Sequence, residues 1–162
     1  MVSDKISNFT DEKTRFLSNF YPHKKGGGKY PHKVRVFYNN IEFDCVENAY
    51  QAAKFTDVKM QIAFSKLSPY EAKAYWETNT DYRADWHLVK LQIMEDLVRQ
   101  KFSNSEELRQ MLLQTDNLLL EEGNDWGDTY WGVCDRVGEN NLGKILMKIR
   151  EELKNGNIFS QK

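Results

Sequence analysis

The sequence predicts a single compact domain of the α+β class, mainly helical, in which a small N-terminal β-hairpin packs against several helices. The chain has 162 residues, 40% of them hydrophobic and 13% aromatic, which is enough for one domain with a real core and short for two. Strand-like alternation is confined to residues 34–43, whereas apolar residues after residue 45 recur mostly at helical spacing. We expect the domain to occupy about residues 8–154, followed by a flexible tail at 155–162.

Composition excludes several classes of function. The formal net charge of −1 gives no global field that would attract nucleic acid or a membrane surface, so recognition of an anion must be local. Cys45 and Cys134 are too few for a disulfide framework, and His23, His32 and His87 show no metal-ligand spacing with them. No apolar run has the length of a signal peptide or a membrane span. We therefore expect a soluble, cytoplasmic protein without a metal or cofactor.

Two segments precede the first predicted helix. Residues 34–38 and 41–43 alternate around Asn39-Asn40, a pair that tolerates the left-handed backbone of a tight turn, so they predict a β-hairpin. The glycine-rich segment 24–29 lacks the Walker pattern of a phosphate loop, and we expect a mobile surface turn there.

Helices are predicted over most of the remaining chain. Ser68-Pro69 with Glu71 is a typical helix start, and this helix should run to about Trp76. The segment Asn117–Glu121 is predicted to be a short buried strand followed by a loop. The other helices are expected at 45–55, 86–102, 104–115 and 141–153.

The helix at 45–55 carries a polar stripe. Glu47, Tyr50, Gln51 and Lys54 lie at i, i+3, i+4 and i+7 and therefore share one face. This face could present a carboxylate and an amine to a substrate. Two alternatives stay open: Asp44 and Glu47 could form a capping box, and Glu47 and Lys54 could be ordinary surface charges.

A second candidate region is the aromatic segment 16–22. It places Phe16, Phe20 and Tyr21 around Ser18 and Asn19, which is unusual for a loop that only spans solvent. The segment could line a site, or its aromatic side chains could simply anchor the N-terminal part of the chain to the core.

Four separated stretches together resemble one family. They are Phe16–Pro22, Glu47–Phe55, Arg83–Trp86 with Val89-Lys90, and Asp125–Gly127 leading to Gly138–Met147. In this order they are similar to the NADAR superfamily, the YbiA-like proteins, over about residues 8–154. The resemblance implies a YbiA-like α+β fold and an N-glycosidase that cleaves, or at least binds, a bond between C1 of a phosphorylated ribose and nitrogen.

The resemblance implies two classes of small-molecule partner. One comprises ribosylamino-pyrimidine phosphates of the riboflavin pathway, and the other comprises ADP-ribosyl conjugates such as ADP-ribosylated guanine, which extends to ADP-ribosylated nucleic acid. The alternative from another class is a module that binds ADP-ribose or a related nucleotide without cleaving it. Neither the oligomeric state nor the leaving base follows from the motifs.

The resemblance also assigns roles by position. Glu47, Lys54 and Asp125 are the candidate catalytic residues, since a carboxylate can stabilise an oxocarbenium-like sugar and a desolvated lysine can attack C1. Lys54 could instead bind phosphate. Asn48 departs from the pattern, because the family more often has histidine there. The candidate substrate-binding residues are Ser18, Asn19, Phe20, Gln51, Arg83, Trp86, Trp126 and Asn140.

Phosphate recognition must come from local cations. Arg15, Arg83 and Lys90 are candidates, and we favour Arg83 because it lies in a family-like stretch. Asp85 could be only the N-cap of the following helix.

Overall fold

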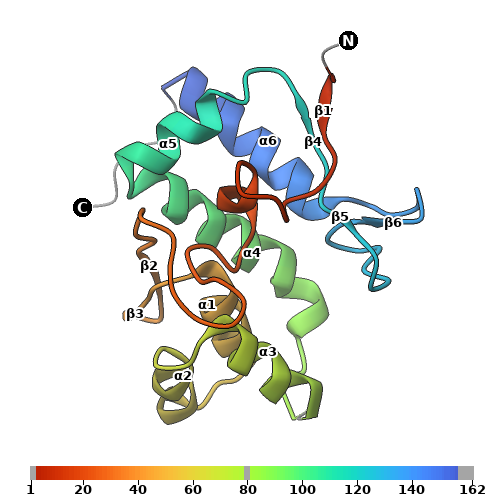
Figure 1. Cartoon of the computed structure of the whole chain (residues 1–162). Coiled ribbons are helices and arrows are strands. Elements are labelled where there is room, and N and C mark those ends of the chain that lie inside the picture. The colour runs from red at the N-terminus through yellow and green to blue at the C-terminus, as the bar shows by residue number, and fades with distance from the viewer. Residues whose placement is uncertain (1–2, 79–80, 157–162) are drawn as a thin grey trace. The chain divides into compact units, whose positions relative to one another are not determined.

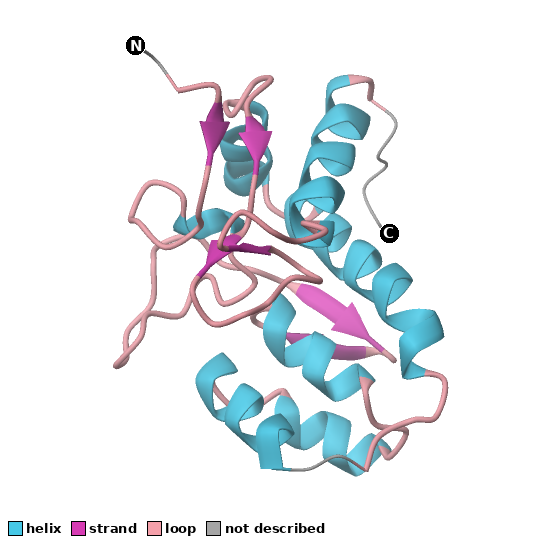
Figure 2. Cartoon of the chain, turned by 90° about the vertical axis from the view of Figure 1, so that its right-hand side faces the viewer, coloured by secondary structure: helices cyan, strands magenta, loops and turns pink. Residues whose placement is uncertain are grey.

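The computed structural model describes residues 3–78 and 81–156, and they form two compact units. We call them the central unit, Asn19–Ser105, and the terminal unit, formed by the described residues up to Ser18 and from Glu106 to residue 156. Helix dominates and the strands are short, as Figure 2 shows, so the prediction of a mainly helical α+β fold is confirmed. The helices are η1 Arg15–Leu17, α1 Val46–Ala53, α2 Val58–Phe64, α3 Pro69–Thr78, α4 Trp86–Ser103, α5 Glu106–Leu113 and α6 Asn141–Lys154. The strands are β1 Lys5–Ile6, β2 Val36–Tyr38, β3 Ile41–Phe43, β4 Leu119–Leu120, β5 Gly123–Asn124 and β6 Val133–Cys134.

The predicted hairpin is present in the central unit. Strands β2 and β3 pair antiparallel, and Val36 lies opposite Phe43. Asn39 and Asn40 between them have φ values of 51° and 62°, the left-handed conformation that a two-residue hairpin turn requires. Regular pairing begins at Val36, two residues later than the alternation suggested.

Helix α1 is the centre of this unit. It packs against α2, α3, α4 and the hairpin, and every residue from Val46 to Ala53 is buried. Figure 1 shows α1 with α2 and α3 beside it and α4 running past. Alanine at 49, 52 and 53 leaves room for this close approach, because small side chains let neighbouring helices come near.

Helix α2 was not predicted. It has only seven residues, too few for a clear apolar period. Its N-cap residue is Asp57, whose side chain accepts a hydrogen bond from the Lys59 N–H. The start of α3 agrees with the prediction. The Ser68 N–H donates to the Glu71 carboxylate at 2.9 Å, and the Glu71 N–H donates to Ser68 Oγ at 3.2 Å. This helix ends at Thr78, one turn or less beyond the expected end.

The helix predicted at residues 86–102 is α4. Its buried face runs through Trp86, Met94, Leu97, Val98 and Phe102. Positions 89 and 93, which share helical spacing with Leu97, are only half-buried.

The terminal unit combines α5 and α6 with paired short strands. Strand β4 is parallel to β1, and β5 is parallel to β6. The apolar run 117–121 forms a strand only at Leu119–Leu120, while β1, β5 and β6 were not predicted. Helix α6 buries Leu142, Ile145, Leu146 and Ile149, as its periodicity indicated.

Two remaining expectations concern the chain ends and membranes. Helix α6 ends at Lys154, and residues 157–162 of the expected flexible tail lie outside the described residues. Within the ranges 3–78 and 81–156, no helix is long and apolar enough to cross a membrane.

Candidate functional site

The polar stripe of α1 is buried. Glu47 is 8% exposed, and Gln51 and Lys54 are each 3% exposed, so neither charge is a solvated surface group. The capping-box alternative is wrong as well, because Cys45 is the N-cap residue and no side chain caps this helix. Asp44 instead faces Lys29, with Oδ2 lying 3.1 Å from the ammonium nitrogen.

Lys54 has the most strongly perturbed side chain of the site. Its pKa is lowered to about 7, mainly because burial deprives the ammonium group of hydration, and the charges of Lys90 and Lys73 act in the same direction. Glu47 acts in the opposite direction and raises the pKa. A substantial fraction of Lys54 is therefore the neutral, nucleophilic amine at neutral pH.

Glu47 is held in place from its own helix. The Gln51 side chain, one turn later, donates from Nε2 to Glu47 Oε1 at 2.9 Å. The Oε1 atom of Gln51 is buried and makes no hydrogen bond. An unsatisfied buried acceptor costs stability, so this oxygen is available to a donor on a bound molecule.

Aromatic rings surround the amine of Lys54. Its Nζ lies 5.4 Å from the Tyr50 ring centroid and 5.8 Å from that of Trp86. Tyr50 and Trp86 contact each other with centroids 5.0 Å apart. These rings supply the apolar surroundings that desolvate the lysine, and they place Trp86, a predicted substrate-binding residue, beside Lys54.

The aromatic segment before the hairpin also reaches α1. The Asn19 carbonyl accepts from the Glu47 N–H at 3.1 Å, and the Asn19 side chain donates to the sulfur of Met94 at 3.4 Å. Phe20 packs edge-to-face on Tyr70 of α3, with centroids 5.0 Å apart. The structure therefore brings Asn19 close to the catalytic candidate Glu47 within the central unit.

Asn48, where the resemblance implied histidine, has a structural role here. Its Nδ2 donates to the carbonyls of Phe64, at 2.9 Å, and Leu67, while its Oδ1 accepts from the Cys45 thiol at 2.9 Å. The Asn48 side chain thus links α1 by hydrogen bonds to the C-terminal end of α2. Because the side chain is fully buried and committed to these partners, it is not placed to carry protons.

Replacing Asn48 by alanine should lower the free energy of unfolding by about 2–4 kcal/mol, because two backbone carbonyls lose their donor inside the protein. Urea denaturation followed by circular dichroism measures this loss. Asn104→Ala is the control, because it removes an exposed amide bonded to a single carbonyl. Equal stability of the Asn48 variant and the wild type would contradict the bracing role.

Arg83 and Asp85 bind each other. The guanidinium makes two hydrogen bonds to the carboxylate, at 2.6 and 2.9 Å, and a third to the Tyr38 hydroxyl at 3.3 Å. Asp85 precedes α4 but forms no side-chain cap. The Arg83 N–H donates to the Lys54 carbonyl at 2.8 Å, so the backbone of this predicted residue adjoins the site while its guanidinium is already engaged.

The other predicted site residues belong to the terminal unit. Asp125 and Trp126 follow β5, and both are exposed, Trp126 by 56%. Asn140 is buried, and its amide accepts from the Glu122 N–H and donates to the Leu120 carbonyl, each at 2.9 Å. Ser18 is half-buried at the end of η1. Their roles in binding or catalysis, and a cleft shared with Glu47, stay predictions.

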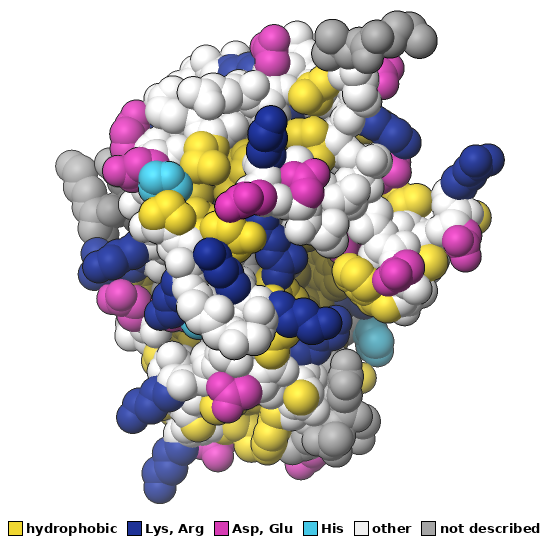
Figure 3. Space-filling model, in the orientation of Figure 1, with side chains coloured by type: hydrophobic (Ala, Val, Ile, Leu, Met, Phe, Trp, Pro, Cys, Tyr) yellow, Lys and Arg dark blue, Asp and Glu magenta, His cyan; other side chains and the backbone are white. Residues whose placement is uncertain are grey.

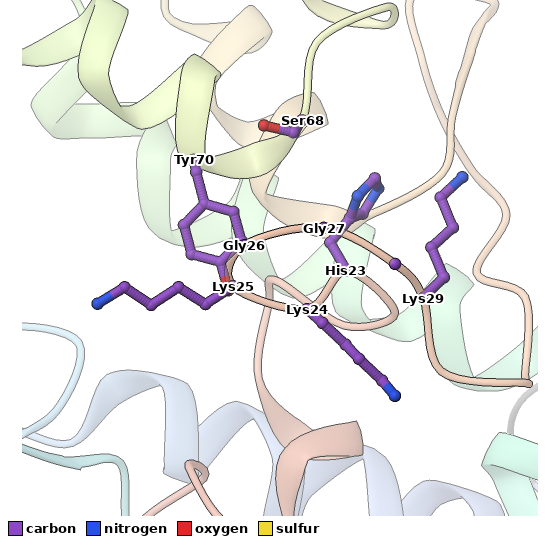
Figure 4. A pocket seen from close by; sticks show the side chains of 9 residues that line it. His23, Lys24, Lys25, Gly26, Gly27, Lys29, Ser68 and Tyr70 are labelled. Atoms are coloured by element: carbon purple, nitrogen blue, oxygen red, sulfur yellow. The ribbon is translucent and has the colours of Figure 1, made fainter.

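A basic cavity of about 770 Å³ lies beside the turn at residues 23–29, which we call the basic turn. An isolated bridge between His23 and Lys29 closes this turn, and residues 24–29 are exposed, as expected for a surface turn. Figure 3 shows Lys and Arg side chains over this part of the chain. In Figure 4, the side chains of Lys24, Lys25 and Lys29 point in different directions.

The basic turn also contributes to a mixed polar cluster. His23, Asp44 and Cys45 bring their nitrogen, oxygen and sulfur atoms within 4.8 Å of one another, a proximity that their spacing did not indicate. Lys29 pairs with Asp44, the Cys45 thiol donates to Asn48, and burial raises the pKa of Cys45. The cluster is thus held by internal hydrogen bonds and an ion pair.

The sequence of this chain is similar to those of known proteins. The family model described as NADAR domain matches residues 7–154. An N-glycosidase of Nostoc punctiforme is 37% identical over 131 residues, which cover 77% of this chain and 82% of that protein. A riboflavin biosynthesis protein of Vibrio vulnificus is 33% identical over 148 residues, 88% of this chain but only 36% of that longer protein.

A solved structure is similar as well. N-glycosidase YbiA of Escherichia coli is 32% identical over 160 residues, 94% of this chain and 91% of YbiA. Its NMR structure matches with a TM-score of 0.75 at 29% identity, covering 100% of this chain and 92% of that one.

Proposed function

This chain belongs to the NADAR domain family of N-glycosyl hydrolases, and we propose that it hydrolyses the C1–N bond of a phosphorylated ribosyl compound. The observation that carries the proposal is the buried pair on α1. Lys54 is a desolvated amine with a pKa of about 7, and Glu47 is a buried carboxylate on the same face. Two such groups held in an aromatic environment suit acid–base and nucleophilic chemistry at a sugar carbon.

The proposed reaction begins with attack by Lys54. The neutral amine attacks C1 of the ribose and the C1–N bond breaks, while Glu47 takes one proton from the lysine nitrogen and passes it to the leaving base. The sugar ring then opens as the second nitrogen proton moves to the ring oxygen, which leaves an imine between C1 and Lys54. Water then adds to the imine and releases ribose phosphate and the free lysine. Glu47 also stabilises the positive charge that develops on the sugar.

This proposal predicts how activity depends on pH. Only the neutral amine can attack, and the pKa of Lys54 is lowered to about 7 instead of the ordinary 10.5. We expect kcat/KM to rise as the pH increases through about 7 and then to level. Steady-state rates of base release between pH 5.5 and 9 measure this profile. A profile that is flat or falls with pH across this range would contradict attack by a neutral amine with this pKa.

The preferred substrate class is the ribosylamino-pyrimidine phosphates. The relative from Vibrio vulnificus is named a riboflavin biosynthesis protein, and this name supports the choice. ADP-ribosyl conjugates, including ADP-ribosylated guanine and nucleic acid, form the second class because they contain the same ribosyl C1–N bond. In both classes the buried rings of Tyr50 and Trp86 form the apolar surroundings of the Lys54 amine.

We place the reaction in the cytoplasm. Cys45 and Cys134 are both free thiols, which is typical of a reducing compartment.

The decisive experiment incubates the purified protein with a panel of ribosyl N-glycosides and follows the products by mass spectrometry. The panel contains riboflavin intermediates and ADP-ribosylated guanine. We expect release of a free base and a ribosyl phosphate from at least one member. Calorimetry with ADP-ribose runs in parallel. Tight binding without base release across the panel would favour a binding module instead.

A further inference from the structure

Gln51 lies between Glu47 and Lys54 on the polar face of α1. It follows Glu47 by four residues and precedes Lys54 by three, and Lys54, the C-cap residue, still has helical φ and ψ values. The three side chains therefore share one face of the helix. All three are buried. A molecule that reaches both the carboxylate and the amine therefore also meets the Gln51 amide.

The hydrogen bond to Glu47 fixes the orientation of the Gln51 amide. Its Nε2 donates to Glu47 Oε1 at 2.9 Å. An ionised carboxylate only accepts hydrogen bonds, and Glu47 acts on the pKa of Lys54 as a negative charge. A flipped amide would bring two acceptors together. The carbonyl oxygen of Gln51 is therefore turned away from Glu47.

The carbonyl oxygen of Gln51 has no donor. Gln51 Oε1 is buried, and none of the residues that the structure describes donates a hydrogen bond to it. Gln61 of α2 is equally buried, yet its Nε2 donates to the Phe55 carbonyl at 2.7 Å and its Oε1 accepts from Asn39 at 2.9 Å. Buried polar groups in folded proteins are nearly always paired, so the oxygen of Gln51 points to a donor on a bound molecule.

We propose that Gln51 Oε1 accepts a hydrogen bond from the C2 hydroxyl of the substrate ribose and thereby selects ribosyl over 2-deoxyribosyl compounds. This assignment rests on the proposed function, which places C1 beside Glu47 and Lys54. The C2 hydroxyl belongs to the carbon next to C1, and both proposed substrate classes contain it. It also stays with the sugar when the base departs, so the same contact holds the sugar after the C1–N bond has broken.

The contact with the C2 hydroxyl becomes stronger during the reaction. Positive charge builds on C1 as the C1–N bond breaks, and this charge makes the neighbouring hydroxyl a better donor. A fixed carbonyl acceptor therefore stabilises the transition state more than the bound substrate. Gln51 thus touches the substrate through Oε1 and positions Glu47 through Nε2, while the proton transfers stay with Glu47 and Lys54.

Kinetics with paired substrates test this contact. The ribosyl compound of the panel that releases most base and its 2-deoxyribosyl counterpart are each given to the wild type, Gln51→Met and Gln61→Met. Loss of the hydroxyl also changes the intrinsic reactivity of the glycoside, so the measured quantity is the ratio of the two kcat/KM values, compared between proteins. We expect the ratio of ribosyl to deoxyribosyl to fall at least about tenfold in Gln51→Met, because methionine offers the hydroxyl no oxygen.

Two further variants separate this role from a structural one. Gln61→Met makes the same substitution at an equally buried residue of the same unit and should keep the wild-type ratio. Gln51→Glu keeps an oxygen for the hydroxyl, so it should retain most of the ratio. It should slow both substrates, because a second carboxylate beside Glu47 disturbs the ionisation of that group. Circular dichroism checks that each variant is folded.

Calorimetric titration provides a readout that needs no base release. The probes are ribose 5-phosphate and 2-deoxyribose 5-phosphate, each with the wild type, Gln51→Met and Gln61→Met. We expect the wild type and Gln61→Met to bind ribose 5-phosphate at least about tenfold more tightly than the deoxy sugar, since only the former pairs the buried oxygen. Gln51→Met should bind the two sugar phosphates alike.

The outcomes separate the contact from the reaction. Equal affinity of the wild type for the two sugar phosphates overturns the contact with the C2 hydroxyl. Base release with the same kcat/KM ratio in the wild type and Gln51→Met keeps the N-glycosidase reaction and rejects the contact. This is also the result expected if the nitrogen of the C1–N bond were the donor to Gln51. Selective binding of ribose 5-phosphate that Gln51→Met abolishes, without base release from any substrate, supports the contact and rejects the reaction.

Discussion

Replacing Lys54 by methionine should reduce base release by about a thousandfold or more, because the variant lacks the group that attacks C1. Methionine preserves the length of the buried stem and lacks only the amine. Initial rates with the best substrate of the panel measure the loss. Lys66→Met, an exposed lysine after α2, is the matched control and should keep full activity.

Stability measurements show whether this loss comes from misfolding. The pKa of Lys54 is lower in the folded protein than the ordinary 10.5, so the unfolded chain binds more protons between about pH 7 and 10.5. The wild type should therefore gain stability as the pH rises through that window, and Lys54→Met should lack this gain. A variant that unfolds more easily than the wild type at pH 7 would contradict the interpretation, since methionine removes a desolvation cost.

Replacing Glu47 by glutamine should slow base release by about 10²–10⁴-fold, the usual contribution of a positioned acid–base group. Glutamine keeps the shape of the side chain and an oxygen for the hydrogen bond from Gln51. Residual rates measured under single-turnover conditions give the loss in the chemical step. Glu42→Gln removes an exposed carboxylate of β3 and is the matched control.

The pH profile of the Glu47 variant gives a second, independent check. Glu47 raises the pKa of Lys54, so its removal should move the rise in kcat/KM to lower pH. Any remaining activity should therefore appear at a lower pH than in the wild type. A shift in the opposite direction would show that the two side chains do not interact as the structure indicates.

The sequence predicted the elements that are stabilised by contacts between residues close in the chain. Asn39 and Asn40 adopt the left-handed turn themselves, and Ser68 and Glu71 satisfy each other at the start of α3. Strand β1 could not be predicted, because its two residues become a strand only by pairing with Leu119–Leu120, more than a hundred positions away. No local pattern encodes such a pairing.

Prediction of the site from the sequence was limited in the same way, because burial depends on contacts between distant parts of the chain. Spacing placed Glu47, Gln51 and Lys54 on one face of a helix, and the structure confirms that face. The sequence left a cap or a surface charge as alternatives, because burial of this face depends on packing by α2, α3 and α4. The effect of the Lys73 charge on the pKa of Lys54 was missed for this reason, since the position of Lys73 on α3 says nothing about a residue that follows α1.

The most direct test of the central claim traps the covalent intermediate. The protein is mixed with a phosphorylated ribosyl substrate and borohydride, and intact-mass and peptide spectra locate any adduct. The account predicts a reduced ribosyl phosphate attached to Lys54, absent from Lys54→Met and retained in Lys24→Met/Lys25→Met. Continued base release with no adduct on Lys54 under the same conditions would contradict it.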